Sequence, residues 1–241
     1  MCTHFIETEQ QAMSRTALER SVRALAPLLS EARRQRIADV VNSRTGSLAV
    51  LLENAWDEGN RNAVLRSMDA FGTHTLHCIN YGKEGKATSS SGASEMRTDA
   101  GARNWIVRRD WSEVETCIRQ LQREGFTIAS TTPNSNKTLQ DVDFSKRLVI
   151  AFGNEHIGVS EALLEASDVK FSIPMIGFVE SVNLSVSVAV TLYQAFSQRL
   201  ARLGNHGDLS ESEKLQLTLH YYMQSLGVQL AQNVIDRYSN I

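Results

Sequence analysis

The most constraining feature of this sequence is the alternation of short apolar runs with amphipathic segments between residues 48 and 173. The first run, LAVLLEN, covers residues 48–54, and further strands are predicted at 75–79, 126–130, 147–152 and 169–173. Helices are predicted between them at 62–71, 112–124 and 160–166. Strands that alternate with helices indicate an α/β fold with a parallel sheet, which binds ligands at the carboxyl ends of its strands.

Helical patterns flank this region on both sides. Residues 12–41 predict two amphipathic helices that are interrupted at Pro27, and residues 181–203 predict one long helix that Ser181 would cap. Two further helices are predicted at 209–222 and 228–238. We therefore divide the chain into a helical segment (1–45), an α/β domain (46–203) and a helical extension (204–241). Residues 82–102 are small and polar, and so long a loop within a compact domain is expected to be functional.

Composition excludes several classes of protein. The 241 residues are 42% hydrophobic, too apolar for a disordered chain, yet no window approaches the roughly 18 uninterrupted apolar residues of a membrane span. The N-terminus does not resemble a secretory signal. Cys2, Cys78 and Cys117 are far apart and lack C-x-x-C spacing, which favours reduced thiols over a zinc site. We expect a cytoplasmic protein without a membrane segment or a metal.

Charge is nearly balanced, with 25 basic and 27 acidic residues, but arginines are concentrated near the N-terminus. Every basic residue before position 45 is an arginine, namely Arg15, Arg20, Arg23, Arg33, Arg34, Arg36 and Arg44. A guanidinium group binds phosphate oxygens bidentately, which makes RNA or DNA a reasonable partner. The alternative is a solvated helix face, and charge alone does not exclude it.

The usual nucleotide-binding and hydrolytic motifs are missing. The segment around 80–92 fails the G-x-x-x-x-G-K-[ST] pattern, and no strand is followed by G-x-G-x-x-G. There is no H-E-x-x-H and no G-x-S-x-G. A nucleotide-binding metabolic enzyme and a serine hydrolase are both disfavoured.

Three segments hold polar residues that a purely structural role explains poorly. Asn60 and Arg66 follow the first predicted strand, although Arg66 could also extend past its apolar neighbours to water. The run GNEHIG at 153–158 follows another strand, where it could also be a plain exposed turn. Asn183 lies two residues after Ser181 in the otherwise apolar segment 173–190, and helix capping by Ser181 leaves Asn183 unexplained.

Together, and in this order, the three segments resemble the motifs of the SpoU (TrmH-like) branch of the SPOUT RNA 2′-O-methyltransferases. Those motifs are an Asn with an Arg six residues later, a G-x-E-x-x-G turn, and I-P-M-x-G-x-x-x-S-x-N-x-S-x-x-x-A. This sequence has Asn60 and Arg66, GNEHIG, and IPMIGFVESVNLSVSVAV. The resemblance spans roughly residues 33–202. The segments EARRQRIADVV and GARNW resemble those of tRNA guanosine-2′-O-methyltransferases.

The resemblance implies a parallel α/β sheet with a C-terminal deep trefoil knot, so that residues 46–203 would be a SPOUT methyltransferase domain. It further implies a homodimer that binds S-adenosylmethionine (AdoMet) and methylates a ribose 2′-hydroxyl of RNA. We expect tRNA before rRNA, with guanosine 18 of the D-loop as the first nucleotide to test. The alternatives are rRNA, another tRNA position, or a catalytically silent RNA-binding dimer.

The resemblance also assigns roles to residues of this sequence. The catalytic candidates are Arg66, which would accept or stabilise charge at the 2′-oxygen, with Asn60, Glu155, Ser181 and Asn183 around it. Cofactor-binding candidates are Thr131, Gly153, Ile173, Met175 and Val182. RNA-binding candidates are Arg33, Arg36, Arg44, Arg199 and Arg202. Asp57-Glu58-Gly59 departs from the Lys-Pro-His expected before Asn60 and adds negative charge there.

Overall fold

The computed structural model describes residues 13–55, 57–80 and 99–239. The chain divides into two compact units, of which one comprises residues 47–204 and the other comprises residues 1–46 together with 205–241. Most of the predicted loop at 82–102, and residues 1–12 of the N-terminal segment, lie outside the described residues.

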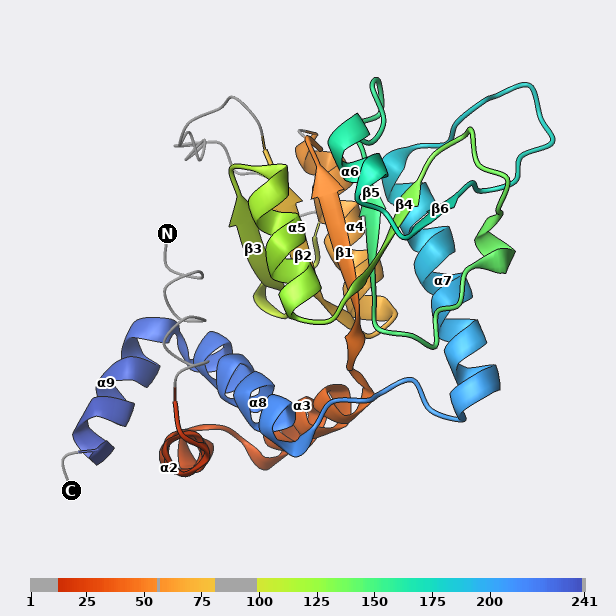
Figure 1. Cartoon of the computed structure of the whole chain (residues 1–241). Helices are drawn as coiled ribbons and strands as arrows, with labels where there is room; N and C mark the ends of the chain where they lie inside the picture. The colour runs from red at the N-terminus through yellow and green to blue at the C-terminus, as the bar shows by residue number, and fades with distance from the viewer. Residues whose placement is uncertain (1–12, 56, 81–98, 240–241) are drawn as a thin grey trace. The chain divides into compact units, whose positions relative to one another are not determined.

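The unit of residues 47–204 is built on a parallel sheet (Figure 1). Its six described strands follow the order β3-β2-β1-β5-β4-β6. Their bounds are Thr45–Glu53 (β1), Thr73–Ile79 (β2), Val107–Trp111 (β3), Thr127–Thr131 (β4), Leu148–Phe152 (β5) and Val169–Phe171 (β6). The prediction of an α/β fold with a parallel sheet is confirmed.

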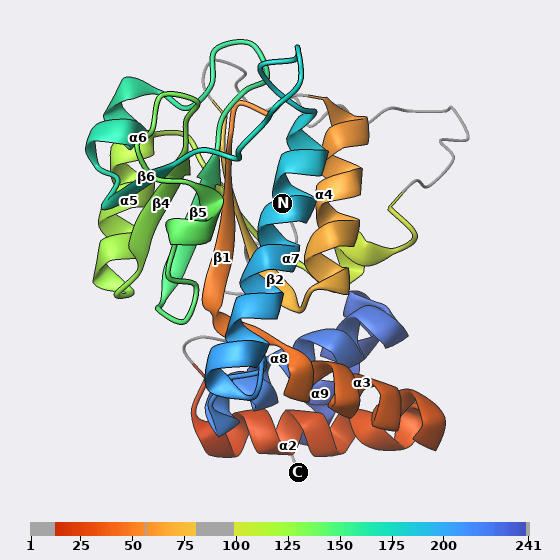
Figure 2. The same cartoon turned by 90° about the vertical axis from the view of Figure 1, so that its right-hand side faces the viewer.

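Helices cover both faces of this sheet. Successive side chains of β1 point to opposite faces, so that Leu48, Val50 and Leu52 enter one buried cluster while Ala49 and Leu51 enter the other. The first cluster is closed by α4 (Glu58–Ala70) and α7 (Leu184–Leu203), which lie side by side in Figure 2. The second is closed by α5 (Val114–Arg123) and α6 (Glu161–Glu165). Short 3-10 turns occupy Ala102–Asn104 (η2) and Leu139–Asp141 (η3).

Two helix starts differ from the sequence-based expectations. Helix α4 begins before Asn60, because Asp57 caps it by accepting the Asn60 N–H through Oδ1 at 2.6 Å. Helix α7 is capped by Asn183, whose Oδ1 accepts the N–H of Ser185 at 2.8 Å, and not by Ser181. Both caps satisfy N–H groups that the first turn of a helix leaves without a partner. Capping therefore explains part of the role of Asn183.

Strand β3 was not predicted from the sequence. It lies at the edge of the sheet, where it pairs with β2 alone, and its residues VRRDW alternate between partly buried and exposed. An edge strand with charged residues has no apolar run by which it could be recognised.

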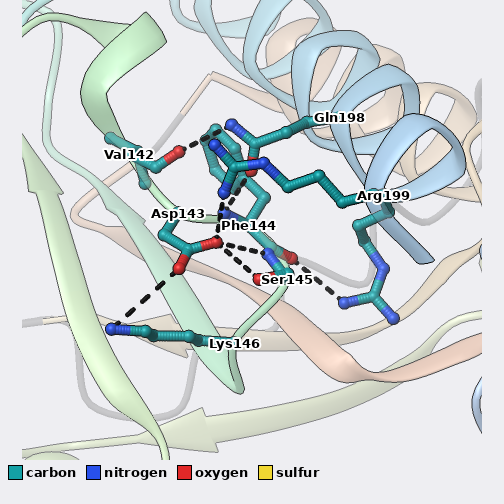
Figure 3. A network of polar contacts seen from close by, with 8 residues as sticks. Val142, Asp143, Phe144, Ser145, Lys146, Gln198 and Arg199 are labelled. Atoms are coloured by element: carbon teal, nitrogen blue, oxygen red, sulfur yellow. Dashed lines mark hydrogen bonds and ion pairs between the residues drawn. The ribbon is translucent and has the colours of Figure 1, made fainter.

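The C-terminal half of α7 is fastened to the turn that leads into β5 (Figure 3). Gln198 donates through Nε2 to the carbonyl oxygen of Val142 at 2.9 Å and accepts the N–H of Phe144 through Oε1 at 2.7 Å. Arg199 donates through Nη1 to the carbonyl oxygen of Phe144 at 3.0 Å. The Phe144 side chain is fully buried, so the turn is held by both packing and hydrogen bonds.

The unit formed by the two ends of the chain is helical. It contains α2 (Arg15–Leu25), the 3-10 turn η1 (Ala26–Leu28), α3 (Glu31–Ser43), α8 (Glu211–Leu226) and α9 (Val228–Ser239). Helix α2 packs against α8 and α9, and α3 packs against α8. Asp208 joins the two ends, because its Oδ1 accepts the N–H of Gly46 at 2.7 Å and the hydroxyl of Thr45 at 3.0 Å. The sequence predicted these helices but not their association.

No described helix is long and apolar enough to cross a membrane. Within the same part of the chain, no group of three or more His, Cys, Asp and Glu side chains is placed to hold a metal ion.

Candidate active site

Asn60 links the three sequence motifs by two side-chain hydrogen bonds. Its Nδ2 donates to Oε1 of Glu155 at 2.6 Å, and its Oδ1 accepts Nδ2 of Asn183 at 2.9 Å. Asn60 belongs to the first turn of α4, Glu155 follows β5, and Asn183 precedes α7. The fold thus brings three of the five catalytic candidates into one hydrogen-bonded chain.

The orientation of the Asn183 side chain follows from its neighbours. Its Oδ1 accepts both the N–H of Ser185 at 2.8 Å and the hydroxyl of Ser185 at 2.6 Å. The amide nitrogen, which can only donate, is therefore the atom that faces Asn60. Helix capping and the contact with Asn60 use opposite ends of one side chain.

Glu155 lies on a tight turn formed by residues 153–158. Asn154 and Gly158 exchange backbone hydrogen bonds of 3.1 and 2.8 Å. A Cβ atom at Gly153 would lie 2.0 Å from the carbonyl carbon of Gly158, far inside van der Waals contact. Only glycine fits this position, which gives a steric reason for the first glycine of the GNEHIG motif.

The same turn is fastened to the end of β1. Nδ2 of Asn154 donates to the carbonyl oxygen of Asn54 at 2.9 Å, and the N–H of Ser160 donates to Oε2 of Glu53 at 2.8 Å. Glu53 is 1% exposed, and Asn54 adopts a left-handed backbone with φ of 53°. Neither Glu53 nor Asn54 was predicted from the sequence as part of the site. The available signal was a carboxylate and an amide at the end of an apolar strand.

The remaining catalytic candidates, Arg66 and Ser181, lie on the elements that carry Asn60 and Asn183. Arg66 is exposed on α4, six residues after Asn60. Ser181 is exposed in the segment between β6 and α7, two residues before Asn183. Their positions place a guanidinium and a hydroxyl group on the segments adjoining the hydrogen-bonded chain.

The cofactor candidates follow the carboxyl ends of the neighbouring strands β5, β4 and β6. Thr131 ends β4 and donates through Oγ1 to the carbonyl oxygen of Ala151 at 3.2 Å, and Gly153 directly follows β5. Ile173 packs against the core, while Met175 and Val182 are 39% and 37% exposed. Residues 173–182 form neither helix nor strand. Apolar side chains beside irregular backbone suit a ligand with both an apolar and a hydrogen-bonding part.

Three of the arginine candidates are accessible to a ligand. Arg36 is exposed on α3, and Arg33 is partly exposed and donates to Oγ of Ser225 through Nε and Nη2, each at 3.2 Å. The Arg202 side chain is 51% exposed and pairs with Asp143 at 2.7 Å.

The structure argues against the other two arginines as RNA contacts. Arg44 and Arg199 are each 1% exposed. Arg44 donates through Nε to the hydroxyl of Tyr221 at 3.0 Å, and Arg199 donates to the backbone of Phe144. Both guanidinium groups form hydrogen bonds in the interior of the protein. The sequence could not show this, because an amino-acid sequence does not distinguish exposed from buried arginines.

The model of the SpoU rRNA Methylase family matches residues 47–193, which contain all three motifs. The chain belongs to this family. The predicted SpoU-family methyltransferase is thus confirmed. Its relatives include a tRNA (guanosine(18)-2′-O)-methyltransferase of Thermus thermophilus, 36% identical over 172 residues, which cover 71% of this chain and 85% of the relative. An enzyme of the same name from Borreliella burgdorferi is 30% identical and covers 88% of this chain and 94% of its own.

Solved structures of SpoU enzymes have the same fold. The TrmH/SpoU tRNA modifying enzyme of A. aeolicus matches with a TM-score of 0.71 and 28% identity, over 81% of this chain and 98% of its own. The SpoU methyltransferase AviRb from Streptomyces viridochromogenes, in complex with AdoMet, matches with a TM-score of 0.57 and 25% identity. That match covers 68% of this chain and 64% of the AviRb chain.

Proposed function

We propose that this methyltransferase transfers a methyl group from AdoMet to a ribose 2′-hydroxyl of tRNA, with guanosine 18 of the D-loop as the target. The observation that carries the proposal is the hydrogen-bonded chain Glu155–Asn60–Asn183, which joins the three motifs of the family. Two relatives that align over most of their length are named for methylation of guanosine 18, and this supports the choice of nucleotide.

The reaction requires the 2′-oxygen to attack the methyl carbon in line while its proton is removed or shared. AdoMet would supply a methyl group made electrophilic by the positive sulfur, and the bond between sulfur and the methyl carbon would break as the bond to the 2′-oxygen forms. Arg66 is the residue proposed to act on the 2′-oxygen. A guanidinium group ordinarily keeps its proton, which favours stabilisation of the developing negative charge by hydrogen bonds. Transient loss of that proton is the alternative role.

Glu155, Asn60 and Asn183 are proposed to orient the reacting groups. One oxygen of Glu155 accepts the Asn60 amide at 2.6 Å, so the carboxylate is held and its other oxygen can accept a hydrogen bond from Arg66 or from the ribose. Ser181 adds a hydroxyl group on the approach to α7. Rigid placement of such groups contributes to catalysis because the geometry of attack is reached before reaction.

The cofactor site is proposed to lie around Thr131, Gly153, Ile173, Met175 and Val182, within a C-terminal trefoil knot. The proposal of a knotted C-terminal segment is supported by backbone pairing between the segments that follow β4 and β6. The N–H of Ser172 donates to the carbonyl oxygen of Lys137 at 2.9 Å, and the N–H of Leu139 donates to the carbonyl oxygen of Ser172 at 2.8 Å. The chain after β6 therefore runs beside the chain after β4, as a threaded C-terminal segment requires.

We propose a homodimer with α7 in the interface. Val186, Val190, Tyr193 and Leu200 recur at spacings of four, three and seven residues, which places them on one face of the helix. They are 46%, 43%, 59% and 41% exposed. Exposed apolar side chains aligned on one face of a helix mark an interaction site.

Residues 1–45 are proposed to be a segment that contacts RNA through Arg33 and Arg36, and residues 204–241 are proposed to be a C-terminal helical extension. Arg202 is a further proposed contact from the methyltransferase domain. The cytoplasm stays the predicted location.

The test is to incubate the protein with labelled AdoMet and a tRNA transcript and then to map 2′-O-methylated nucleotides. Methylation at guanosine 18, and its loss when that nucleotide lacks the 2′-hydroxyl, is the expected result. Methylation of rRNA but not of tRNA would make rRNA the substrate, in line with the name of the SpoU rRNA Methylase family. Absence of both AdoMet binding by calorimetry and methylation would favour the silent RNA-binding dimer.

A further inference from the structure

Arg61 is a partly buried cation in the first turn of α4, directly after Asn60. Consecutive Cα atoms are about 3.8 Å apart, so the backbone of Arg61 is fixed beside the hydrogen-bonded chain. Its N–H donates to the carbonyl oxygen of Asp57 at 3.1 Å. Within residues 13–55, 57–80 and 99–239, its guanidinium group forms no hydrogen bond and no ion pair.

The neighbours of Arg61 do not neutralise it. Burial raises the pKa of the Cys78 thiol to about 11, against the opposing influence of Arg108 and Arg61, so the thiol is uncharged at neutral pH. Arg108, on β3, is already paired with Asp110, which accepts from its Nε at 3.0 Å and from its Nη2 at 2.6 Å. The charged groups that act on this thiol, Arg61, Arg108 and Asp110, therefore sum to one positive charge.

Nearby acidic groups are engaged or exposed. Asp57 accepts the N–H of Asn60 as the cap of α4. Glu58 is exposed in the same turn. Partial burial of a cation without a counter-ion costs free energy, which an anionic ligand at this position would recover.

We infer that Arg61 binds a phosphate of the RNA substrate next to the ribose that is methylated. The inference rests on the proposed function, because that function supplies the polyanion. Guanidinium groups match phosphate oxygens with two parallel N–H donors, which fixes position as well as adding affinity. Arg61 would thus be a positioning residue for the nucleotide on which Arg66 acts.

The carboxylate of AdoMet is the competing anion, and the order of the strands disfavours it. Helix α4, which carries Arg61, packs against β2, on one side of β1. The cofactor candidates follow β5, β4 and β6, on the other side of β1. Arg61 therefore lies toward the half of the sheet away from the proposed cofactor site.

The test compares Arg61→Gln, Arg61→Lys and a control, Lys146→Gln, in the full-length protein. Lys146 is 68% exposed and precedes β5, at the opposite end of that strand from Glu155. Binding of a tRNA transcript is measured by fluorescence anisotropy over a range of salt concentrations. AdoMet binding is measured by calorimetry, and methyl transfer is followed with labelled AdoMet.

We expect Arg61→Gln to weaken RNA binding about tenfold, the effect of losing one hydrogen bond to a charged group. The slope of log affinity against log salt should fall by about 0.7–0.9, corresponding to one phosphate contact. Arg61→Lys should keep most of the slope because it keeps the charge. AdoMet affinity should not change, and Lys146→Gln should behave as the wild type.

Three results would overturn the inference. An unchanged salt slope in Arg61→Gln, while the wild type methylates RNA, removes the phosphate contact and leaves the proposed function intact. Loss of AdoMet affinity with an unchanged RNA slope would assign Arg61 to the cofactor carboxylate. A wild type that neither binds nor methylates RNA would overturn the proposed function as well.

Discussion

Asn183 and Asn60, which are 123 positions apart, share a hydrogen bond of 2.9 Å that connects the start of α7 to the start of α4. The same Asn183 side chain caps α7, so one residue contributes to stability and to the proposed chemistry. The two contributions can be separated because each uses a different end of the amide.

Asn183→Asp should separate them. An aspartate still accepts the N–H of Ser185 and suits a helix N-terminus, but it cannot donate to Asn60. We expect the free energy of unfolding to stay close to the wild type while methyl transfer falls at least about tenfold. Asn183→Ala, the matched variant, should in addition lose about 1 kcal/mol of stability. Urea unfolding and single-turnover methylation measure the two effects. Wild-type activity in Asn183→Asp would show that donation to Asn60 is unimportant.

Arg66→Ala should abolish most of the reaction while AdoMet still binds. Removal of a group that stabilises charge at the attacking oxygen costs about 100-fold or more in turnover. Calorimetry with AdoMet and single-turnover methylation of tRNA are the two measurements. Arg66→Lys is the control, because it keeps the charge but loses the planar fork. Near-normal turnover of Arg66→Ala would remove this residue from the mechanism.

Gly153→Ala should destabilise the turn that carries Glu155. The added methyl group would lie 2.0 Å from the carbonyl carbon of Gly158, and overpacking of this kind costs about 1–3 kcal/mol or more. Gly177→Ala is the matched control, because a Cβ there meets nothing within 4 Å. Thermal unfolding compares the two variants. Equal melting temperatures would mean that residues 153–158 can relax.

Stability should fall in mild acid because of His77. Burial, helped by the charge of Arg109, lowers the pKa of His77 to about 3 in the folded state. Below about pH 6.5 the unfolded chain takes up a proton that the folded protein does not, so stability is full above this pH and declines toward pH 3. Between pH 7 and 5 the loss should be about 2 kcal/mol.

Urea unfolding at several pH values measures the decline. His77→Gln is the informative variant. In the wild type, Nδ1 of His77 accepts the Trp111 side-chain N–H at 3.1 Å, and the amide oxygen of glutamine can accept the same N–H. Glutamine, however, does not titrate. The variant should have lower stability at pH 7 but a shallower pH dependence. An identical pH dependence in both proteins would assign the acid sensitivity to other groups.

Val190→Asp should weaken the proposed dimer. A charge in the middle of the exposed apolar row of α7 would have to be desolvated in an interface, at a cost of several kcal/mol. Sedimentation velocity should show a shift from dimer to monomer at micromolar concentration. Thr218→Asp, on α8, serves as a substitution outside this row. A wild type that sediments as a monomer would contradict the proposed interface directly.

Local patterns predicted the α/β class because buried parallel strands are apolar on both faces, as β5 illustrates. The motif residues Asn60, Glu155 and Asn183 could be named from the sequence because their spacing matches the family. Their hydrogen bonds could not, since contacts over 95 and 123 positions depend on how the strands are ordered in the sheet.

Other features were beyond sequence patterns for definite reasons. Strand β3 has the composition of a surface segment, and Asp57 and Ser181 both have side chains that can cap a helix, although only Asp57 does so. Arg44 and Arg199 are buried by partners that are distant in sequence, such as Tyr221 and Phe144. Exposure of an arginine is a property of the tertiary structure.

Helix α7 has a mechanical consequence for the enzyme. Its 20 residues form a helix about 30 Å long. At its N-terminus Asn183 is hydrogen-bonded to Asn60, and in its C-terminal half Gln198 is hydrogen-bonded to the turn before β5. Strand β5 runs from that turn toward Glu155, so α7 and β5 are connected at both ends. A substitution of the buried Phe144 in this turn, unlike one of the exposed Lys146, would shift the C-terminal half of α7 and the start of β5, and so would alter the proposed alignment of the carboxylate with the ribose.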